Sequence, residues 1–299
     1  MHFLVSVPIN ENLASFIGKK GSEDGLIFFN RKLGDNTIVA IMPANKEDKV
    51  YYNMAESMLI CTQIVISTET VDKSLGEAVV AASLAGKHII ITDDNDVSGI
   101  VLGLLEDFEV APMDALLDRI TGRNEVHEGR LRIDVDKSFP VKGIGTVALG
   151  IVTNGVVKVH DTLYSGDGKQ ATVKSIQSQD IDVAEAGYGT RVGLALKGIE
   201  HDDLGKGDLL LAEPYRRTRA ARISLHISPA SKEAIEPQGR YMFVSNLSRA
   251  FCKIEEVGAD SARVAFEKPL SVLSGDRFLL IRDASPRIFA SGTVTECII

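Results

Sequence analysis

The sequence predicts an N-terminal α/β domain with a mostly parallel sheet, followed by two all-β barrel domains. Short apolar runs alternate with stretches of helical periodicity up to Gly122, which is typical of α/β domains. Beyond Arg123, short strands alternate with turn residues, as in barrels and sandwiches. The charge changes at the same place: residues 1–122 hold 18 acidic and 9 basic residues, whereas the remainder is almost balanced. Pattern and charge together predict a domain boundary near residue 123.

The first domain, residues 1–123, is expected to begin with a hairpin and then to alternate strands and helices. Strands are expected at residues 3–7, 26–29, 37–42, 63–67, 88–92 and 108–111, and the second and third form the hairpin. Helices are expected around residues 51–59, over 74–84 with Gly86 just past the end, over 96–106, and from Pro112 to Gly122. The glycine-containing stretch 17–25 is expected to form a surface turn. This alternation predicts helices on both faces of the sheet.

The β half is expected to form two units, residues 124–213 and 214–299. A chain of 299 residues is longer than a single hydrophobic core usually organises. Glycines recur throughout the first β unit, as in a barrel with tight turns. In the second unit, strands are expected at residues 221–227, 240–246, 251–257, 261–266 and 277–282.

Two stretches of the first β unit carry specific motifs. Residues 132–162 have the sequence RIDVDKSFPVKGIGTVALGIVTNGVVKVHDT, and residues 185–211 have EAGYGTRVGLALKGIEHDDLGKGDLLL. Both resemble the second domain of translational GTPases, particularly EF-Tu and the selenocysteine-specific elongation factor. Gly143 and Gly145 permit a tight turn between two strands whose alternate residues face the barrel interior. Residues 275–294 resemble the end of the third domain of the same family, so the resemblance extends over nearly the whole chain.

The resemblance implies a GTPase fold in the first domain, but the phosphate-binding motif of that fold is missing. A P-loop requires G-x-x-x-x-G-K-[ST] directly after the first strand, because its backbone amides and lysine surround the phosphates. The chain instead has PINENLASF at residues 8–16, without glycine or lysine. The sequence therefore predicts a degenerate P-loop GTPase-like domain.

The other nucleotide motifs of the family are also altered. The D-x-P-G-H motif, which reaches Mg²⁺ and the γ-phosphate, and the N-K-x-D motif, which recognises guanine, lack most of their functional side chains here. Asp96 is interpreted as a helix N-cap rather than a guanine ligand. We therefore expect no GTP, no Mg²⁺ and no GTPase activity. The degenerate positions are Ile41, Met42, Pro43, Ala44 and Asn45 for the first motif, and Asp93 and Asp96 for the second.

The start of the second domain is one candidate for RNA contact. In the family that this chain resembles, this segment faces the GTPase domain and lies near the acceptor end of tRNA. The resemblance places Asp136, Phe139 and Lys142 at such a groove. Lys142 offers a charge to phosphate, and Phe139 offers a surface on which a base can stack. The alternative is that these residues serve only the structure of the barrel.

A basic cluster at the start of the third domain is the other candidate. Arg216, Arg217 and Arg219 lie close together in the sequence, with Arg222 shortly after them. Such a cluster suits contact with the phosphate backbone of tRNA or ribosomal RNA. The alternative, which we favour from the sequence, is a solvated strand face paired with nearby Asp or Glu.

The sequence offers little support for other functions. The six histidines have no metal-binding spacing and no nucleophile elbow is present, so no catalytic residue and no metal site is predicted. The apolar runs are shorter than the roughly 20 residues that span a bilayer. The N-terminus lacks the features of an export signal. We expect a cytoplasmic protein that binds neither membrane nor DNA.

Together these features predict an elongation-factor-like binding module that has lost GTP binding and hydrolysis. Its expected partner is tRNA, the ribosome or another translation factor. Two alternatives remain open. One is a functional GTP-binding elongation factor with an atypical nucleotide site, and the other is a protein-interaction scaffold without affinity for RNA.

Overall fold

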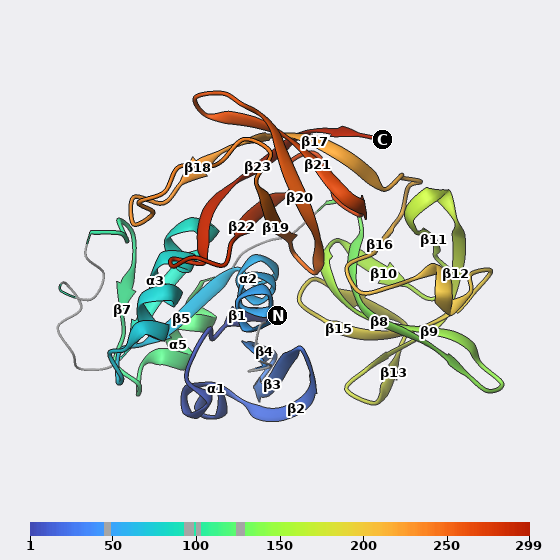
Figure 1. The fold of residues 1–299 in the computed structure, drawn as a ribbon. Coiled ribbons are helices and arrows are strands. Elements are labelled where there is room, and N and C mark those ends of the chain that lie inside the picture. Colours follow the sequence, from blue (N-terminus) through green and yellow to red (C-terminus); the bar gives the residue numbers. More distant parts are fainter. Residues whose placement is uncertain (45–48, 93–98, 100–102, 124–128) are drawn as a thin grey trace.

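The computed structural model describes residues 1–44, 49–92, 99, 103–123 and 129–299. Three bodies are visible in Figure 1: an α/β domain at the N-terminus, a first barrel in green and yellow, and a second barrel in orange and red. The α/β domain contacts both barrels. None of the described helices is long and apolar enough to cross a membrane.

The described part of the α/β domain contains a seven-stranded sheet in the order β2-β3-β4-β1-β5-β6-β7. The strands β4, β1, β5, β6 and β7 run parallel to one another. The strands β2 and β3 are added at the β4 edge, and the β2–β3 and β3–β4 pairs are antiparallel. The mostly parallel sheet and the β3–β4 hairpin confirm the sequence-based predictions. The strands are β1 (His2–Ser6), β2 (Lys19–Asp24), β3 (Leu26–Leu33), β4 (Asn36–Pro43), β5 (Gln63–Ser67), β6 (His88–Thr92) and β7 (Glu109–Val110).

Helices cover both faces of this sheet, as predicted. The helices α2 (Val50–Ile60) and α3 (Lys73–Ala85) pack on one face, and α1 (Glu11–Ile17) and α5 (Leu116–Gly122) pack on the other. Helix α3 ends at Gly86, which adopts the left-handed conformation with φ 65° that favours glycine.

Two local predictions in this domain are wrong, and a third lies largely outside the described residues. The stretch expected to be a surface turn forms the exposed edge strand β2, because its backbone pairs with β3. Helix α5 begins at Leu116 rather than Pro112, because Ala115 N donates to Pro112 O in a turn that precedes the helix. The expected helix over 96–106 lies largely outside the described residues. Of its described residues, Gly99 is helical and 103–106 are not, and Gly103 has a φ of 70°.

The first barrel is closed by six strands in the order β11-β16-β8-β9-β15-β12, with β12 pairing back onto β11. Its interior is filled by alternate apolar side chains of these strands, as the spacing predicts. The strands are β8 (Arg132–Val141), β9 (Gly145–Asn154), β10 (Val156–Lys158), β11 (Thr162–Tyr164), β12 (Gln170–Ser178), β13 (Ile181–Val183), β14 (Glu185–Gly187), β15 (Arg191–Lys197) and β16 (Leu209–Leu211); short 3₁₀ helices occupy Gly166–Gly168 and His201–Asp203.

The second barrel is likewise closed by six strands, in the order β17-β21-β20-β19-β22-β23, with β23 pairing back onto β17. Closure removes the exposed sheet edges in both barrels. The strands are β17 (Thr218–Ser224), β18 (His226–Ile227), β19 (Arg240–Ser245), β20 (Ser248–Val257), β21 (Ser261–Leu270), β22 (Arg277–Ile281) and β23 (Ile288–Ile298).

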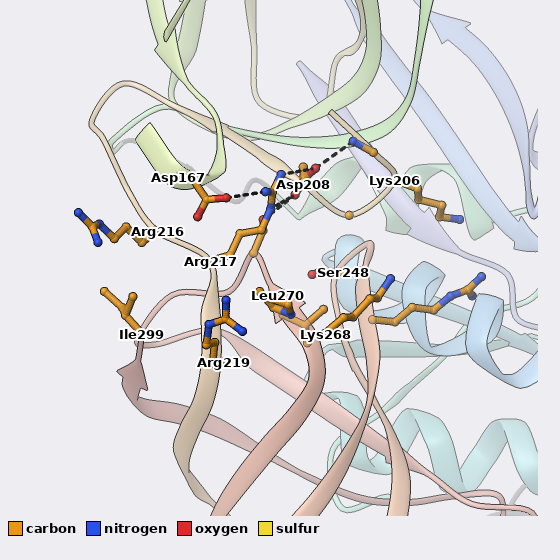
Figure 2. Close-up of a pocket in the computed structure, with 15 residues that line it drawn as sticks. Asp167, Lys206, Asp208, Arg216, Arg217, Arg219, Ser248, Lys268, Leu270 and Ile299 are labelled. Carbon is orange, nitrogen blue, oxygen red and sulfur yellow. Dashed lines mark hydrogen bonds and ion pairs between the residues drawn. The ribbon is translucent and has the colours of Figure 1, made fainter. Parts of the chain in front are cut away.

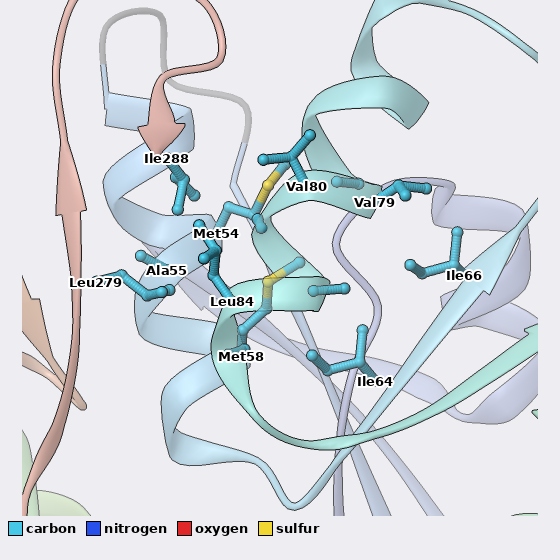
Figure 3. Close-up of a cluster of buried hydrophobic side chains, with 14 of the residues drawn as sticks. Met54, Ala55, Met58, Ile64, Ile66, Val79, Val80, Leu84, Leu279 and Ile288 are labelled. Atoms are coloured by element: carbon cyan, nitrogen blue, oxygen red, sulfur yellow. The ribbon is translucent and has the colours of Figure 1, made fainter. Parts of the chain in front are cut away.

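The α/β domain and the second barrel share one hydrophobic core. Met54 and Met58 of α2 and Leu84 of α3 pack in the same buried cluster as Leu279 of β22 and Ile288 of β23. Figure 3 shows side chains from both domains meeting between the two helices and these strands. Arg277 of β22 adds polar contacts, since its Nε donates to Ala85 O at 3.1 Å at the end of α3. The contact is therefore built like the interior of a single domain.

Candidate functional site

A cavity of about 390 Å³ lies where a nucleotide site is expected in a sheet of this topology. It opens at the carboxyl ends of β1 and β5, on either side of the point where the strand order reverses. Open α/β sheets usually bind ligands at such a switch point. We call this cavity the crevice. Its lining residues are Ile9, Asn10, Glu11, Asn12, Ser67, Glu69, Thr70, Asp72 and Ser74.

The loop after β1 is held by the side chain of Asn10. Asn10 Oδ1 accepts a hydrogen bond from Leu13 N at 3.0 Å and so caps the short helix α1. Its Nδ2 donates to Ser67 Oγ at 3.2 Å and to Glu69 Oε2 at 3.1 Å, which ties the loop to the end of β5. A backbone amide at the start of α1 is therefore already occupied by the protein itself.

The charge of the crevice is negative. Glu11, Glu69 and Asp72 contribute carboxylates, and none of the described residues that line the crevice is basic. Asp72 accepts from Leu75 N at 2.9 Å and caps α3, and Glu11 pairs with Lys20 at 2.9 Å on the exposed surface. Two like charges 4 Å apart repel each other by about 1 kcal/mol even in bulk water. A polyphosphate placed in this crevice would meet several such interactions.

The four described positions that replace the D-x-P-G-H motif do not line the crevice. Ile41 is fully buried in a cluster with Ile151 of the first barrel and Leu247 of the second. Met42 and Ala44 pack on the opposite face of β4, and Pro43 pairs with Leu26 in the β3–β4 ladder. The other three degenerate positions, Asn45, Asp93 and Asp96, lie outside the described residues.

A buried carboxylate joins all three domains. Glu56 of α2 is 0% exposed, and its two oxygens pair with Lys206 of the first barrel at 2.7 Å and with Arg249 of the second at 2.9 Å. Burial raises the pKa of Glu56, while the two cations oppose that rise. Asn53, one turn earlier on α2, accepts from Arg249 Nη1 at 3.3 Å. We call Glu56, Lys206 and Arg249 the junction triad.

The candidates at the start of the first barrel lie in different environments. Asp136 is only 8% exposed and its carboxylate faces Arg191 at 3.7 Å and Lys206 at 3.9 Å; burial raises its pKa. Phe139 is half-buried, and Lys142 is exposed in the turn after β8. The five residue steps from Asp136 to the end of β8 span roughly 17 Å at the usual strand rise. The structure therefore keeps Asp136 and Lys142 well apart, with Asp136 engaged in contacts between domains.

A second cavity, of about 520 Å³, lies between the two barrels. We call it the groove. It is lined mostly by polar and charged side chains, several of which are labelled in Figure 2. Its basic residues are Lys206, Arg216, Arg217, Arg219, Arg249 and Lys268, and its acidic side chains are Asp167 and Asp208. Three of the four arginines of the sequence-predicted cluster, Arg216, Arg217 and Arg219, line it.

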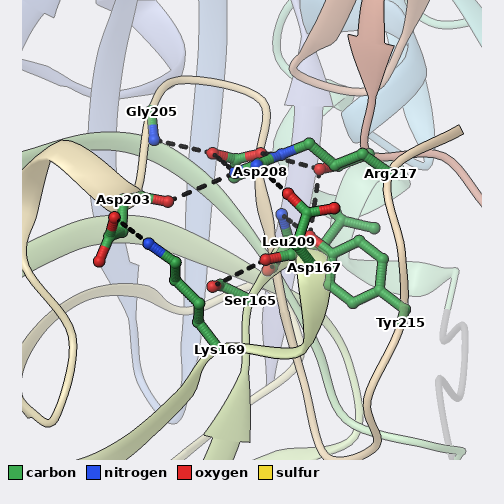
Figure 4. Close-up of polar contacts among 11 residues, drawn as sticks. Ser165, Asp167, Lys169, Asp203, Gly205, Asp208, Leu209, Tyr215 and Arg217 are labelled. Atoms are coloured by element: carbon green, nitrogen blue, oxygen red, sulfur yellow. Dashed lines mark hydrogen bonds and ion pairs between the residues drawn. The ribbon is translucent and has the colours of Figure 1, made fainter. Parts of the chain in front are cut away.

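Arg217 holds the two barrels together. Its Nε donates to Asp208 Oδ1 at 3.0 Å and its Nη1 to Asp167 Oδ2 at 2.8 Å, as Figure 4 shows. The neighbouring Tyr215 donates from its hydroxyl to Leu209 O at 2.9 Å, and burial raises the pKa of this phenol to about 12. Arg217 and Tyr215 therefore serve the contact between the barrels.

The alternative that we favoured for the basic cluster, pairing with nearby acids, is correct for two of its four arginines. Arg217 is paired as described, and Arg222 pairs with Glu256 at 3.7 Å and with Glu296 at 3.5 Å. Arg216 and Arg219 are exposed and have no ion pair within the described ranges of the chain.

Sequence reasoning missed Glu56, Lys206, Arg249 and Lys268. A signal existed for Glu56, because a glutamate within a helix that is otherwise buried along most of its length has to find a cation. Lys206, Arg249 and Lys268 lie in separate turns or strand ends. Only the packing of the three domains brings them to one place.

The fold and the sites define a three-domain protein with the architecture of translation elongation factors. The family model described as Elongation factor Tu domain 2 matches residues 145–211. The structure of the elongation factor SelB from Methanococcus maripaludis, in complex with the GTP analogue GppNHp, superposes with a TM-score of 0.79 at 18% identity. This match covers 99% of this chain and 80% of that one.

Sequence comparison gives the same relationship. The chain is 29% identical over 189 residues to the selenocysteine-specific elongation factor of Escherichia coli, which covers 60% of this chain but only 30% of that factor. It is also 29% identical over 291 residues to an uncharacterized protein of Methanocaldococcus jannaschii, covering 93% of this chain and 94% of that protein. The chain is thus an EF-Tu-like and SelB-like protein, and the resemblance expected from its sequence is confirmed.

Proposed function

We propose that this chain is a translation-factor-like binding module that binds RNA without binding or hydrolysing GTP. The observation that carries the proposal is the crevice, whose lining among the described residues has three carboxylates and no basic side chain. A site for a magnesium nucleotide triphosphate needs free backbone amides and a lysine around the phosphates. Here Asn10 occupies the amide of Leu13, and Glu11, Glu69 and Asp72 bring three carboxylates to the crevice.

The shared core supports a module that does not switch. A GTPase cycle depends on segments that are ordered by the γ-phosphate and released after hydrolysis. In this chain α2 is packed against the second barrel through Met54 and Met58, and Glu56 ties it to both barrels. Release of α2 would expose this apolar surface and separate buried charges, which is costly. The domain arrangement is therefore expected to be the same with and without nucleotide.

RNA is the partner that agrees best with the relatives and with the charge distribution. The chain is similar to elongation factors, and three exposed cations, Arg216, Arg219 and Lys268, line the groove between the barrels. The net negative charge is concentrated in the α/β domain, where 18 acidic residues stand against 9 basic ones, which suits RNA bound by the barrels.

The experiment is a pair of titrations with the full chain. A fluorescent GTP analogue with Mg²⁺ is expected to show no saturable binding at micromolar concentration. A tRNA transcript is expected to bind at low salt, with the same affinity in the presence and absence of GTP. Saturable micromolar binding of the analogue that depends on Mg²⁺ would establish the alternative of a functional GTP-binding factor. Absence of any tRNA binding at low salt would favour the scaffold without RNA affinity.

A further inference from the structure

The groove contains more positive charge than its own acids can neutralise. Its two acidic side chains, Asp167 and Asp208, are both bonded to Arg217. Lys206 and Arg249 are bonded to the buried Glu56 at the inner end. Three cations are left over, Arg216, Arg219 and Lys268, and none of them has an ion pair within the part of the chain that the structure describes.

Two of these cations are brought together by an irregularity in the second barrel. In the β17–β21 ladder Thr218 pairs with Leu270, but Ala220 pairs with Ala265, so the strands diverge between these pairs. Arg219 and Lys268 both belong to the divergent stretch. Like charges on neighbouring strands destabilise a sheet, and bulges of this kind often direct side chains toward functional sites.

The nearest acid in the sequence does not neutralise Lys268. Glu267 forms a two-pronged pair with Arg240, from Nε at 2.5 Å and Nη2 at 2.9 Å. Figure 2 shows Arg219 and Lys268 rising from the strands below the loop that carries Asp208, with Arg216 at the outer end of the groove. The unneutralised charge therefore extends along the groove from its outer end toward the junction triad.

We propose that the groove binds the phosphodiester backbone of RNA, with Arg216, Arg219 and Lys268 as its phosphate ligands. This inference rests on the proposed function and assigns to it a surface outside the α/β domain. Arginine and lysine in an open, polar groove bind successive phosphates without reading bases. The cavity of about 520 Å³ has room for a stretch of backbone, and both barrels contribute to its walls. Arg217 acts as a positioning residue, because it fixes the two walls relative to each other through Asp208 and Asp167.

The test uses the full chain with Arg216→Gln, Arg219→Gln and Lys268→Gln combined. The matched control removes three cations from the same barrel outside the groove, through Arg222→Gln, Lys253→Gln and Arg263→Gln. Binding of a tRNA transcript and of a 12-nucleotide oligouridylate is measured against salt concentration. Each lost phosphate contact lowers the slope of log affinity against log salt by about one. For the groove variant, we expect the slope of log affinity against log salt to fall by about two to three units. We also expect its affinity at low salt to fall at least about tenfold. The control keeps the wild-type slope.

The outcomes separate this inference from the proposed function. If the wild type binds tRNA and the groove variant binds it with unchanged slope, the groove inference is overturned and the proposed function stands. If the groove variant loses slope but the wild type also binds the fluorescent GTP analogue saturably with Mg²⁺, the groove inference stands and the proposed function fails. Absence of binding to either probe at low salt overturns both. Arg219→Lys, which keeps the charge, is expected to retain most of the affinity, and circular dichroism of each variant checks that it is folded.

Discussion

The crevice of the α/β domain and the groove between the barrels have opposite electrostatic character. The crevice occupies the place where a related GTPase would hold phosphates, yet its lining is acidic and Asn10 caps the helix that begins there. The groove has no counterpart among the nucleotide motifs, yet it presents Arg216, Arg219 and Lys268 without acidic partners among the described residues. A fold can therefore keep its shape while the surface suited to phosphate lies elsewhere on the molecule.

The largest expected effect concerns the junction triad, which links the α/β domain to the inner end of the groove. Glu56→Ala leaves Lys206 and Arg249 close together and partly buried without a counter-charge. We expect a loss of about 3–5 kcal/mol in the free energy of unfolding, measured by denaturant titration. Glu11→Ala, which breaks the exposed pair with Lys20 near the crevice, is the control and should cost less than about 1 kcal/mol. Equal effects of the two variants would contradict the difference between the buried and exposed pairs.

The next effect tests whether the α/β domain and the second barrel unfold as one unit. Leu279 is fully buried in the core that they share. Leu279→Ala is expected to lower the free energy of unfolding by about 2–5 kcal/mol. Fluorescence and circular dichroism should still report coincident transitions for these two domains, because their core is continuous. Leu163→Ala, in the core of the first barrel, is the control for a comparable cavity away from this contact. Separate transitions in the wild type would show that the two domains are independent.

The sequence predicted the fold of both regions better than it predicted their chemistry. Periodicity located β5 at Gln63–Ser67 and placed Gly86 at the end of α3, because burial on a strand and a left-handed helix end depend on neighbouring residues. The edge strand β2 was missed because all of its residues are exposed and carry no apolar alternation. The groove depends on Lys268 and Arg219 lining the same cavity although they are 49 positions apart, and no local pattern predicts proximity over that separation. The altered D-x-P-G-H positions were recognised in the sequence, but only the structure shows Ile41 in a cluster with both barrels.

The pH dependence of stability tests whether burial or the two neighbouring cations dominate the pKa of Glu56 in the junction triad. Burial raises the pKa of Glu56 above its usual value of 4.5, so between the two pKa values the folded protein holds a proton that the unfolded chain has released. Its contribution to the free energy of unfolding therefore decreases as the pH rises from about 4.5 through the folded-state pKa. Glu56→Gln removes this contribution, and other groups cancel in the difference between wild type and variant.

The measurement is the unfolding free energy of the wild type minus that of Glu56→Gln across this pH range. We expect the difference to decrease as the pH rises. A difference that increases with pH would mean that Lys206 and Arg249, rather than burial, control the ionisation of Glu56. The junction triad would then stabilise the ionised carboxylate, which neutralises one of the two positive charges at the groove's inner end.

The smallest expected effect asks whether charge alone keeps nucleotide out of the crevice. Asp72 caps α3 through the amide of Leu75, so Asp72→Ala should cost about 1 kcal/mol of stability. Asp72→Asn keeps an acceptor for the same amide, and its stability should stay within about 0.5 kcal/mol of the wild type. Combined with Glu69→Gln, it removes two of the three carboxylates of the crevice while Asn10 still occupies the amide of Leu13. We expect this double variant to gain no saturable binding of a fluorescent GTP analogue, because the free amides and the lysine of a phosphate cradle are still absent. If micromolar binding appears, repulsion by the carboxylates is the main barrier, and the crevice and the groove differ in charge rather than in their capacity to hold phosphate.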